Sequence, residues 1–153
     1  KRLPDAAIRT SLIVGFPGEG PAEFKELRAF VREARFDHLG VFAYCREEGT
    51  PAASYGDPVP AREKERRRNG LMEIQAAVSA EKLASFRGRT LEVVRDEPRP
   101  EAPGWLAART RFQAPEVDGA VFLRPPAPAW QSPLGRVKII STGTYDLRGI
   151  FLS

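Results

Sequence analysis

The sequence predicts an α/β segment followed by an all-β segment. In the first part, two apolar runs flank an amphipathic helical pattern, which is typical of a strand, a helix and a second strand. In the second part, short runs alternate between apolar and polar residues, as strands of a small barrel do. We therefore divide the 153 residues into segments 1–86 and 87–153, a length that suffices for one good core or two small ones.

The first predicted strand spans residues 7–15, a largely apolar run that ends in glycine and favours a strand buried on both faces. The turn Gly15-Phe16-Pro17-Gly18 follows it. Pro21 after a glycine, with Glu23 in the first turn, indicates the start of a helix. Because ligands in α/β proteins bind at the carboxyl ends of strands, this turn is the first place to expect a site.

A helix of about four turns is predicted next, because apolar residues recur there at helical spacing. A second strand is predicted at residues 38–44, which completes a βαβ unit with a parallel sheet. Residues 45–60 are rich in Gly, Pro, Ser and acidic residues and predict a loop at the carboxyl end of that strand. The helical stripe consists of Phe24, Leu27, Phe30, Val31 and Ala34.

Residues 61–86 are predicted to form one long helix that stops near Gly88. Gly70 lies inside it and costs about 1 kcal/mol relative to alanine, which predicts a kink or a close contact there. The dense charge run from Arg62 to Arg68 is interpreted as a solvated helix face.

Five short strands are predicted in the second segment, and together they indicate a small antiparallel, OB-like barrel. Turn signals such as Asp118-Gly119 and Thr142-Gly143-Thr144 separate them. The proline-rich residues 124–129 predict a stiff surface loop. The expected strands are residues 90–96, 106–112, 117–124, 136–141 and 145–152.

Composition excludes several classes of protein. Cys45 is the sole cysteine and His38 the sole histidine, so neither a disulfide within the chain nor a cysteine cluster built from this chain alone is expected. No run approaches the ~18 apolar residues of a membrane span, and residues 1–5 do not lead into a signal-peptide core. We expect a cytoplasmic protein with no membrane contact. The net charge of +4 is modest.

The Gly15–Gly18 turn lacks the Gly-Lys-Ser/Thr of a phosphate loop and the Gly-x-Gly-x-x-Gly of a dinucleotide site. From the residues alone, a purely structural turn and a ligand contact remain equally open. In the barrel, cationic side chains interleave with aromatic ones, as in barrels that bind single strands or protein segments. The candidates are Trp105, Arg95, Arg109, Arg111, Arg124 and Lys138, whereas Phe112 and Phe122 are interpreted as core.

Residues 9–19, 36–44 and 47–52 resemble the rear part of a radical S-adenosylmethionine methylthiotransferase. The resemblance continues through residues 71–75, 79–82 and 88–93. Within that superfamily, Glu47-Glu48-Gly49-Thr50-Pro51 and residues 114–119 are similar to the RimO branch, which modifies an aspartate of small-subunit ribosomal protein twelve. The MiaB-like branch, which modifies transfer RNA, is the alternative.

This resemblance implies that residues 1–86 are the last two β/α units of a partial TIM-like radical SAM barrel, and that residues 87–153 are a TRAM domain. It implies an intact enzyme that uses S-adenosylmethionine and two 4Fe-4S clusters to add a methylthio group to the aspartate β-carbon. The family's Cys-x-x-x-Cys-x-x-Cys motif has no counterpart here. The resemblance therefore assigns no catalytic residue and no metal ligand to this chain, which alone is expected to be inactive.

The resemblance also implies site residues. Ile13, Gly15, Ala43 and Tyr44 would line half of the S-adenosylmethionine pocket. Glu19 comes one place later than in the family's Gly-x-Ile-x-Gly-x-x-Glu pattern, and Cys45 is expected to be a buried, inert thiol. The ribosomal protein is the expected substrate of the intact enzyme, which would present it through the barrel. RNA contact through the TRAM domain, or a non-catalytic RNA-binding TRAM module, is the rival hypothesis.

Overall fold

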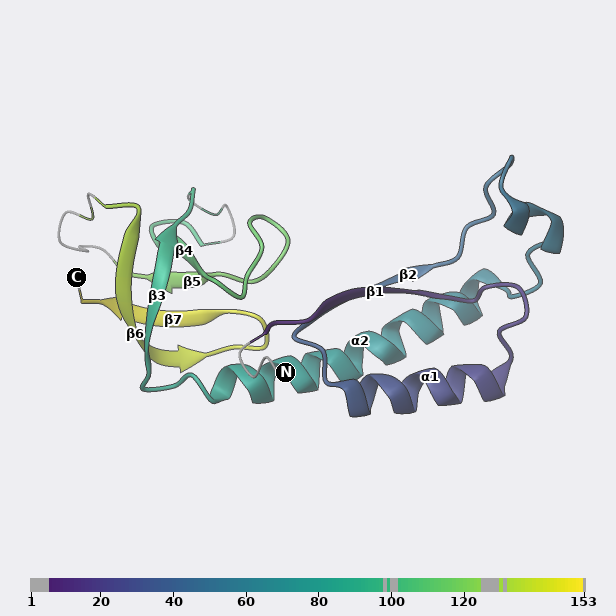
Figure 1. The fold of residues 1–153 in the computed structure, drawn as a ribbon, viewed down its shortest axis with the longest axis horizontal. Coiled ribbons are helices and arrows are strands. Elements are labelled where there is room, and N and C mark those ends of the chain that lie inside the picture. The colour runs from purple at the N-terminus through teal and green to yellow at the C-terminus, as the bar shows by residue number, and fades with distance from the viewer. Residues whose placement is uncertain (1–5, 98, 100–101, 125–129, 131, 153) are drawn as a thin grey trace. The chain divides into compact units, whose positions relative to one another are not determined.

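The computed structural model describes residues 6–97, 99, 102–124, 130 and 132–152. The chain forms two compact units, Ala7–Val78 and a second that contains Ser79–Ser153. We call them the α/β unit and the barrel unit, and Figure 1 labels their elements.

The α/β unit is built on a two-stranded parallel sheet. Strand β1 spans Arg9–Val14, helix α1 spans Pro21–Ala34 and strand β2 spans His38–Ala43. The register runs from Arg9 opposite His38 to Val14 opposite Ala43. The predicted βαβ unit is therefore confirmed, and the two strand ends that carry the candidate site lie next to each other.

Helices α1 and α2 (Ala61–Ala84) cover one face of this sheet. On the other face Ile13 and Phe42 are 57% and 58% exposed. The prediction that the first strand is buried on both faces is wrong, because its residues alternate between the helix-covered face and an open one. The buried core of the unit comprises Val14, Phe24, Val31, Leu39, Val41 and Leu71.

Helix α1 begins as the sequence predicts. Gly20 is the extended residue before the helix, and its N–H donates to the Glu23 carboxylate at 2.9 Å. Pro21 takes the first helical position, where its missing N–H costs nothing. Arg35 ends the helix in the left-handed conformation, with its N–H bonded to the carbonyl of Val31.

Helix α2 has 24 residues and runs without interruption through Gly70. A methyl group added at Gly70 would meet no heavy atom within 4 Å. The predicted close contact is therefore wrong, because the hydrogen atom of Gly70 faces open space. The predicted loop at residues 45–60 also contains a short 3-10 helix, Pro51–Tyr55.

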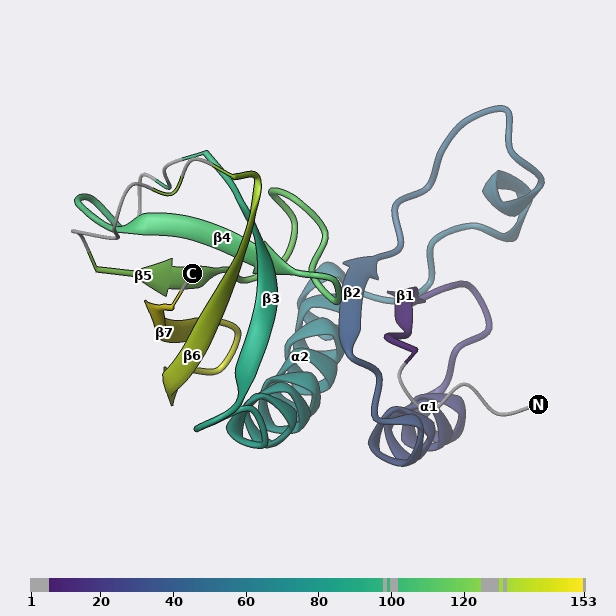
Figure 2. The same cartoon turned by 60° about the vertical axis from the view of Figure 1, so that its left-hand side comes forward.

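The barrel unit is a closed five-stranded barrel, as predicted, with the strand order β3-β4-β5-β7-β6 (Figure 2). One pairing differs from the antiparallel prediction, because β5 and β7 run parallel. The chain passes through β6 between them, and β6 runs antiparallel to β7. The strands span Thr90–Arg95, Leu106–Thr110, Val121–Leu123, Leu134–Thr142 and Leu147–Phe151.

Strand β5 is shorter than the predicted strand at residues 117–124. The Asp118 carboxylate accepts the Ala114 N–H at 2.7 Å and Glu116 has a φ of 63°, so the residues before β5 form a turn. The barrel interior is filled by apolar side chains, and residues 125–129 of the predicted proline-rich loop lie outside the described residues. The interior residues are Val93, Ala108, Val121, Leu123, Trp130, Val137, Ile139 and Leu147.

Candidate functional site at the carboxyl end of the parallel sheet

The turn after β1 is tight and needs glycine. Gly15 has a φ of +75° and Gly18 a φ of +96°, values that residues with a Cβ rarely adopt. The Glu19 N–H donates to the carbonyl of Phe16 at 2.9 Å and closes the turn. The turn thus delivers Glu19 back toward the end of the strand.

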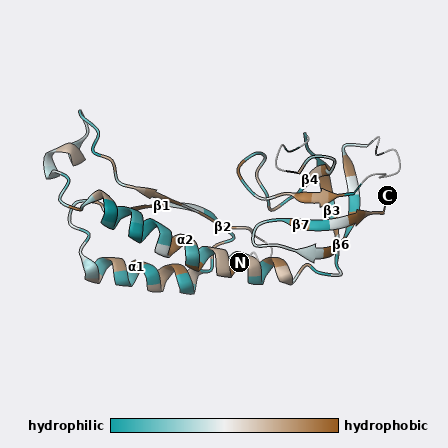
Figure 3. Ribbon diagram, turned by 180° about the vertical axis from the view of Figure 1, so that it is seen from behind, coloured by the Kyte–Doolittle hydropathy of each residue, from teal (hydrophilic) through white to brown (hydrophobic). Residues whose placement is uncertain are grey.

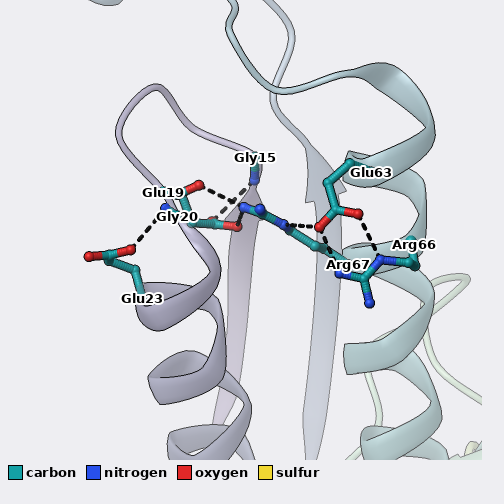
Figure 4. A network of polar contacts seen from close by, with 7 residues as sticks. All are labelled: Gly15, Glu19, Gly20, Glu23, Glu63, Arg66 and Arg67. Atoms are coloured by element: carbon teal, nitrogen blue, oxygen red, sulfur yellow. Dashed lines mark hydrogen bonds and ion pairs between the residues drawn. The ribbon is translucent and has the colours of Figure 1, made fainter.

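Glu19 is held by both ends of its carboxylate (Figure 4). One oxygen accepts a hydrogen bond from the Gly15 N–H at 3.1 Å, and the other accepts one from Nη1 of Arg67 at 2.5 Å. The same Nη1 donates to the Glu19 carbonyl at 2.8 Å, and Nε of Arg67 donates to Glu63 at 2.8 Å. Arg67 therefore ties the turn after β1 to the first turns of α2.

Lys64 makes the corresponding contacts to the end of β2. Its Nζ donates to the Tyr44 carbonyl at 2.8 Å and forms an ion pair with Asp57 at 2.5 Å. The same Nζ lies 5.2 Å from the centre of the Tyr44 ring. The Lys64 methylenes pack against Gly15 so closely that a Cβ at residue 15 would overlap them.

The interpretation of residues 62–68 as a solvated helix face is wrong for two of them. Lys64 is 6% exposed and Arg67 is 5% exposed, although the first turns of α2 are hydrophilic in composition (Figure 3). A cation is buried only when partners replace its water. The partners here are Tyr44 and Asp57 for Lys64, and Glu19 and Glu63 for Arg67. Three of these four partners lie outside α2, so the sequence of the helix does not predict the pairing.

The pairing changes the pKa of Glu63 and of the two arginines bonded to it. Burial acts to lower the pKa of the Arg67 guanidinium, but its hydrogen bonds to Glu63 and Glu19 outweigh burial and raise that pKa overall. Hydrogen bonds from Arg66 and then Arg67 lower the pKa of Glu63 to about 2. Glu63 and Arg67 are therefore both ionised at neutral pH.

The structure brings Ile13, Gly15, Ala43 and Tyr44 together at one end of the sheet. Val14 pairs with Ala43, and the Tyr44 N–H donates to the Val14 carbonyl at 2.9 Å. Tyr44 is buried: its ring packs edge-on against Phe16 at 5.1 Å, and its hydroxyl donates to the Ala52 carbonyl at 3.3 Å.

The open edge of β2 presents the backbone of Ala43. Backbone groups of successive strand residues point to alternate sides. Because the Tyr44 N–H points toward β1, the N–H and C=O of Ala43 point to the edge that no described strand covers. This end of the sheet therefore combines the exposed apolar side chain of Ile13 with free backbone hydrogen-bonding groups.

Two further residues singled out in the sequence, Cys45 and His38, lie at opposite ends of β2. Cys45 is exposed, so the prediction of a buried thiol is wrong. Side chains alternate along an extended segment, and because Tyr44 points inward, Cys45 points outward. His38 is half-buried at the start of β2, at the opposite end of the strand.

In the barrel, one predicted and one unpredicted arginine lie over the ring of Trp105. The guanidinium groups of Arg124 and Arg148 lie 5.2 and 5.5 Å from the centre of its ring. Arg124 belonged to the predicted set, whereas Arg148 was missed. Its exposed position in the alternating strand β7 is the signal that could have found it.

The remaining predicted barrel cations each have a different neighbour. Arg109 pairs with Asp96, and Arg111 lies over the Phe112 ring at 4.6 Å. Arg95 donates to the Trp130 carbonyl at 3.5 Å, and Lys138 is exposed on β6. Phe122 is buried as predicted, and Phe112 is half-buried against Phe86.

Among the described residues, none of the helices has both the length and the hydrophobicity of a transmembrane segment. Within the same residues, no group of three or more His, Cys, Asp or Glu side chains is arranged to hold a metal ion.

Residues 88–151 match the TRAM domain family. This stretch contains all five strands of the closed barrel, so the barrel unit is of the TRAM class. The match agrees with the TRAM domain that the sequence resemblance implies.

The chain as a whole is similar to proteins named ribosomal protein uS12 methylthiotransferase RimO. It is 51% identical over 145 residues to the protein from Nitratidesulfovibrio vulgaris strain DP4, which is 95% of this chain and 34% of that protein. It is 44% identical over 149 residues to the Gloeobacter violaceus protein, and 42% identical over 149 residues to the Aquifex aeolicus protein. Each alignment covers 97% of this chain and 33% or 34% of the relative.

The chain thus spans about a third of the length of the relatives it matches. We identify it as a homologue of the carboxyl-terminal part of RimO-type methylthiotransferases.

Proposed function

We propose that this chain is the carboxyl-terminal part of a radical S-adenosylmethionine enzyme that adds a methylthio group to an aspartate β-carbon of ribosomal protein uS12. In this proposal residues 1–86 complete the radical SAM barrel, and residues 87–153 form the TRAM domain that receives the ribosomal protein. The observation that carries the proposal is the 51% identity to a uS12 methylthiotransferase over 95% of the chain.

The open face of the parallel sheet supports the first half of this assignment. Parallel sheets in α/β proteins are covered on both faces, yet Ile13 and Phe42 on β1 and β2 are more than half exposed. A surface of this kind suits the interior of a barrel whose other strands come from residues outside this chain.

The end of the sheet fits the adenine group of S-adenosylmethionine. Ile13 offers an apolar surface for the flat ring, and the open edge at Ala43 offers one donor and one acceptor for its polar rim. Gly15 lets the chain turn close to such a ligand. Tyr44 would act through its buried ring, because its N–H is bonded to Val14 and its C=O to Lys64.

The bound cofactor and two 4Fe-4S clusters would supply the radical chemistry and the sulfur. This chain's residues would hold the adenine end of the cofactor. The cluster ligands would lie outside the chain, because Cys45 is its sole cysteine. We therefore propose that the chain alone is inactive and that the intact enzyme works in the cytoplasm, where its ribosomal substrate is assembled.

The test is a reconstituted holoenzyme in which this chain replaces the matching 145 residues of the Nitratidesulfovibrio vulgaris protein. Calorimetry should detect S-adenosylmethionine binding, and mass spectrometry should find one methylthio group on an aspartate of uS12. Absence of both, with the unmodified N. vulgaris enzyme active in parallel, would overturn the proposal.

A matched pair of variants tests whether the cofactor binds at this end of the sheet. Ile13→Asp should weaken S-adenosylmethionine binding by about tenfold or more, because it places a charge where the flat ring would lie. Ile150→Asp on the barrel is the control, since Ile150 is 55% exposed against 57% for Ile13. Equal affinities of the two variants would contradict the placement.

RNA binding by the barrel is the second candidate function. The observation that favours it is the placement of two arginines, Arg124 and Arg148, over the single ring of Trp105. Neither guanidinium has a carboxylate partner among the described residues. Cations combined with an aromatic platform are how small barrels hold single-stranded nucleic acid.

Filter binding with a ribosomal RNA fragment and with purified uS12 separates the two candidates. RNA binding should weaken steeply with salt, by roughly 0.7 to 0.9 log units per log unit of salt for each phosphate neutralised. Trp105→Ala should reduce whichever interaction the barrel makes. Tight RNA binding without any uS12 binding would favour the RNA-binding module over the methylthiotransferase.

A further inference from the structure

We propose that Lys64 and Arg67 are positioning residues that hold the two strand ends of the cofactor wall as one rigid unit. They lie on successive turns of α2, and each reaches a different connection of the sheet. The inference rests on the proposed function, because it concerns the same end of β1 and β2.

Lys64 contacts both strand ends by itself. Its charged end binds the Tyr44 carbonyl directly after β2, and its methylenes pack against Gly15 directly after β1. Asp57 adds an ion pair from the far end of the loop that follows β2. One side chain thus links the ends of both strands to the loop that follows β2.

Arg67 constrains Gly15 indirectly, through Glu19. It fixes both the carbonyl and the carboxylate of Glu19, and that carboxylate accepts the Gly15 N–H. Glu63, one turn earlier on α2, anchors the guanidinium through Nε. Gly15 is therefore constrained twice: the Lys64 methylenes pack against it, and its N–H is bonded to Glu19, which Arg67 holds. Both Lys64 and Arg67 belong to α2.

Stability alone is a weak reason for this arrangement. Buried ion pairs often contribute no more to stability than well-packed apolar residues of similar volume, because desolvation offsets much of the attraction. What directional hydrogen bonds add is fixed geometry. Here Lys64 fixes the Tyr44 carbonyl, and Arg67 acts through Glu19 on the N–H of Gly15. Tyr44 directly follows Ala43 and Gly15 is two residues after Ile13, the two proposed adenine contacts.

The arrangement also explains why the loop after β2 would matter to binding. Asp57 is 37% exposed, whereas its partner Lys64 is almost fully buried, so the loop carries the carboxylate that makes burial of the lysine tolerable. Loss of that carboxylate would leave Lys64 free to move away from the Tyr44 carbonyl. The loop would then influence the cofactor wall without touching the cofactor.

The experiment uses the reconstituted holoenzyme described above and compares Lys64→Met, Arg67→Met and Arg67→Lys with the control Arg68→Met. Arg68 is on the same helix, its side chain is 43% exposed, and it pairs with Glu65 rather than with Glu63. The two buried-site methionine variants should raise the KM for S-adenosylmethionine by about tenfold or more, as misplaced binding groups do, with a smaller change in kcat. Arg67→Lys should recover part of the loss, and Arg68→Met should leave KM within about twofold.

The outcomes separate the two proposals. If the unsubstituted holoenzyme fails to bind S-adenosylmethionine, the proposed function fails. If it binds and folded Lys64→Met and Arg67→Met variants keep the original KM, the positioning role is wrong and the two cations are merely structural.

Melting temperatures establish which variants are folded. Should both methionine variants unfold, Asp57→Ala decides the matter, because it removes a partly exposed partner and leaves no buried cavity. A raised KM in Asp57→Ala supports the positioning role, and an unchanged KM overturns it.

Discussion

Lys64 packs so closely against Gly15 that no residue with a Cβ fits at position 15 without moving the lysine. Gly15 also has a φ of +75°, which residues with a Cβ rarely adopt. The turn after β1 therefore requires glycine for two independent reasons, one in its own backbone and one in a side chain from a distant helix.

Gly15→Ala should destabilise the protein by about 1 to 3 kcal/mol from backbone strain, before the overlap with Lys64 is added. Urea unfolding followed by circular dichroism measures the change. Combining it with Lys64→Ala would remove the overlap and leave the strain, so the cost of Gly15→Ala should be smaller in that background. An equal cost in both backgrounds would show that the contact is unimportant.

Gly70→Ala should have the opposite sign and serves as the matched control. Gly70 lies inside α2 with open space where a Cβ would go, so alanine should stabilise the helix by about 0.8 to 1 kcal/mol. The same urea titration checks this, and destabilisation by Gly70→Ala would reveal a packing role that the structure lacks.

Stability should depend on pH through Glu63. Its pKa is about 2 in the folded protein, against 4.5 for the free group. The folded state therefore keeps the carboxylate ionised where the unfolded state already binds a proton. The stabilisation is complete above about pH 4.5 and is lost as the pH falls toward 2.

The measurement is the difference in urea midpoint between the unsubstituted protein and Glu63→Gln. It should be constant from pH 7 to about 5 and shrink between about pH 4.5 and 2. Other carboxylates titrate in both proteins and cancel in the difference. A difference that grows on acidification would mean that Glu63 is not paired with Arg66 and Arg67.

Truncation of Ile139 in the barrel core should lower the free energy of unfolding strongly. This side chain is fully buried among the interior residues of β3, β5 and β7, so Ile139→Ala should cost about 2 to 5 kcal/mol. Its neighbour Ile140 is 47% exposed, and Ile140→Ala should cost much less. Thermal unfolding of both variants tests the inside and outside faces of β6, and similar losses would mean that the alternation is misplaced.

Cys45 should react with a thiol reagent in the folded protein. Because it is exposed, one equivalent of Ellman's reagent should be consumed in buffer at a rate close to that in urea. Reaction only after unfolding would restore the prediction of a buried thiol. Cys45→Ser, which offers no thiol, is the blank.

Local patterns were enough to predict the elements. The helical stripe of α1, the Gly20-Pro21 start and the apolar runs of β1 and β2 report on neighbours within a few residues, and all appear in the structure. The alternating runs of the barrel do so as well. They carried no information on strand order, and the parallel pairing of β5 with β7 follows from the path of the whole chain.

By itself, the sequence determined the two-part architecture and the turn at Gly15. Its resemblance to methylthiotransferases implied the set Ile13, Gly15, Ala43 and Tyr44, which lies at one end of the parallel sheet and stays a proposed site. Only the tertiary structure decided that Lys64 and Arg67 are buried within a run of charges. Their partners Tyr44 and Glu19 lie far away in sequence, and a cation leaves water only where folding has brought such partners to it.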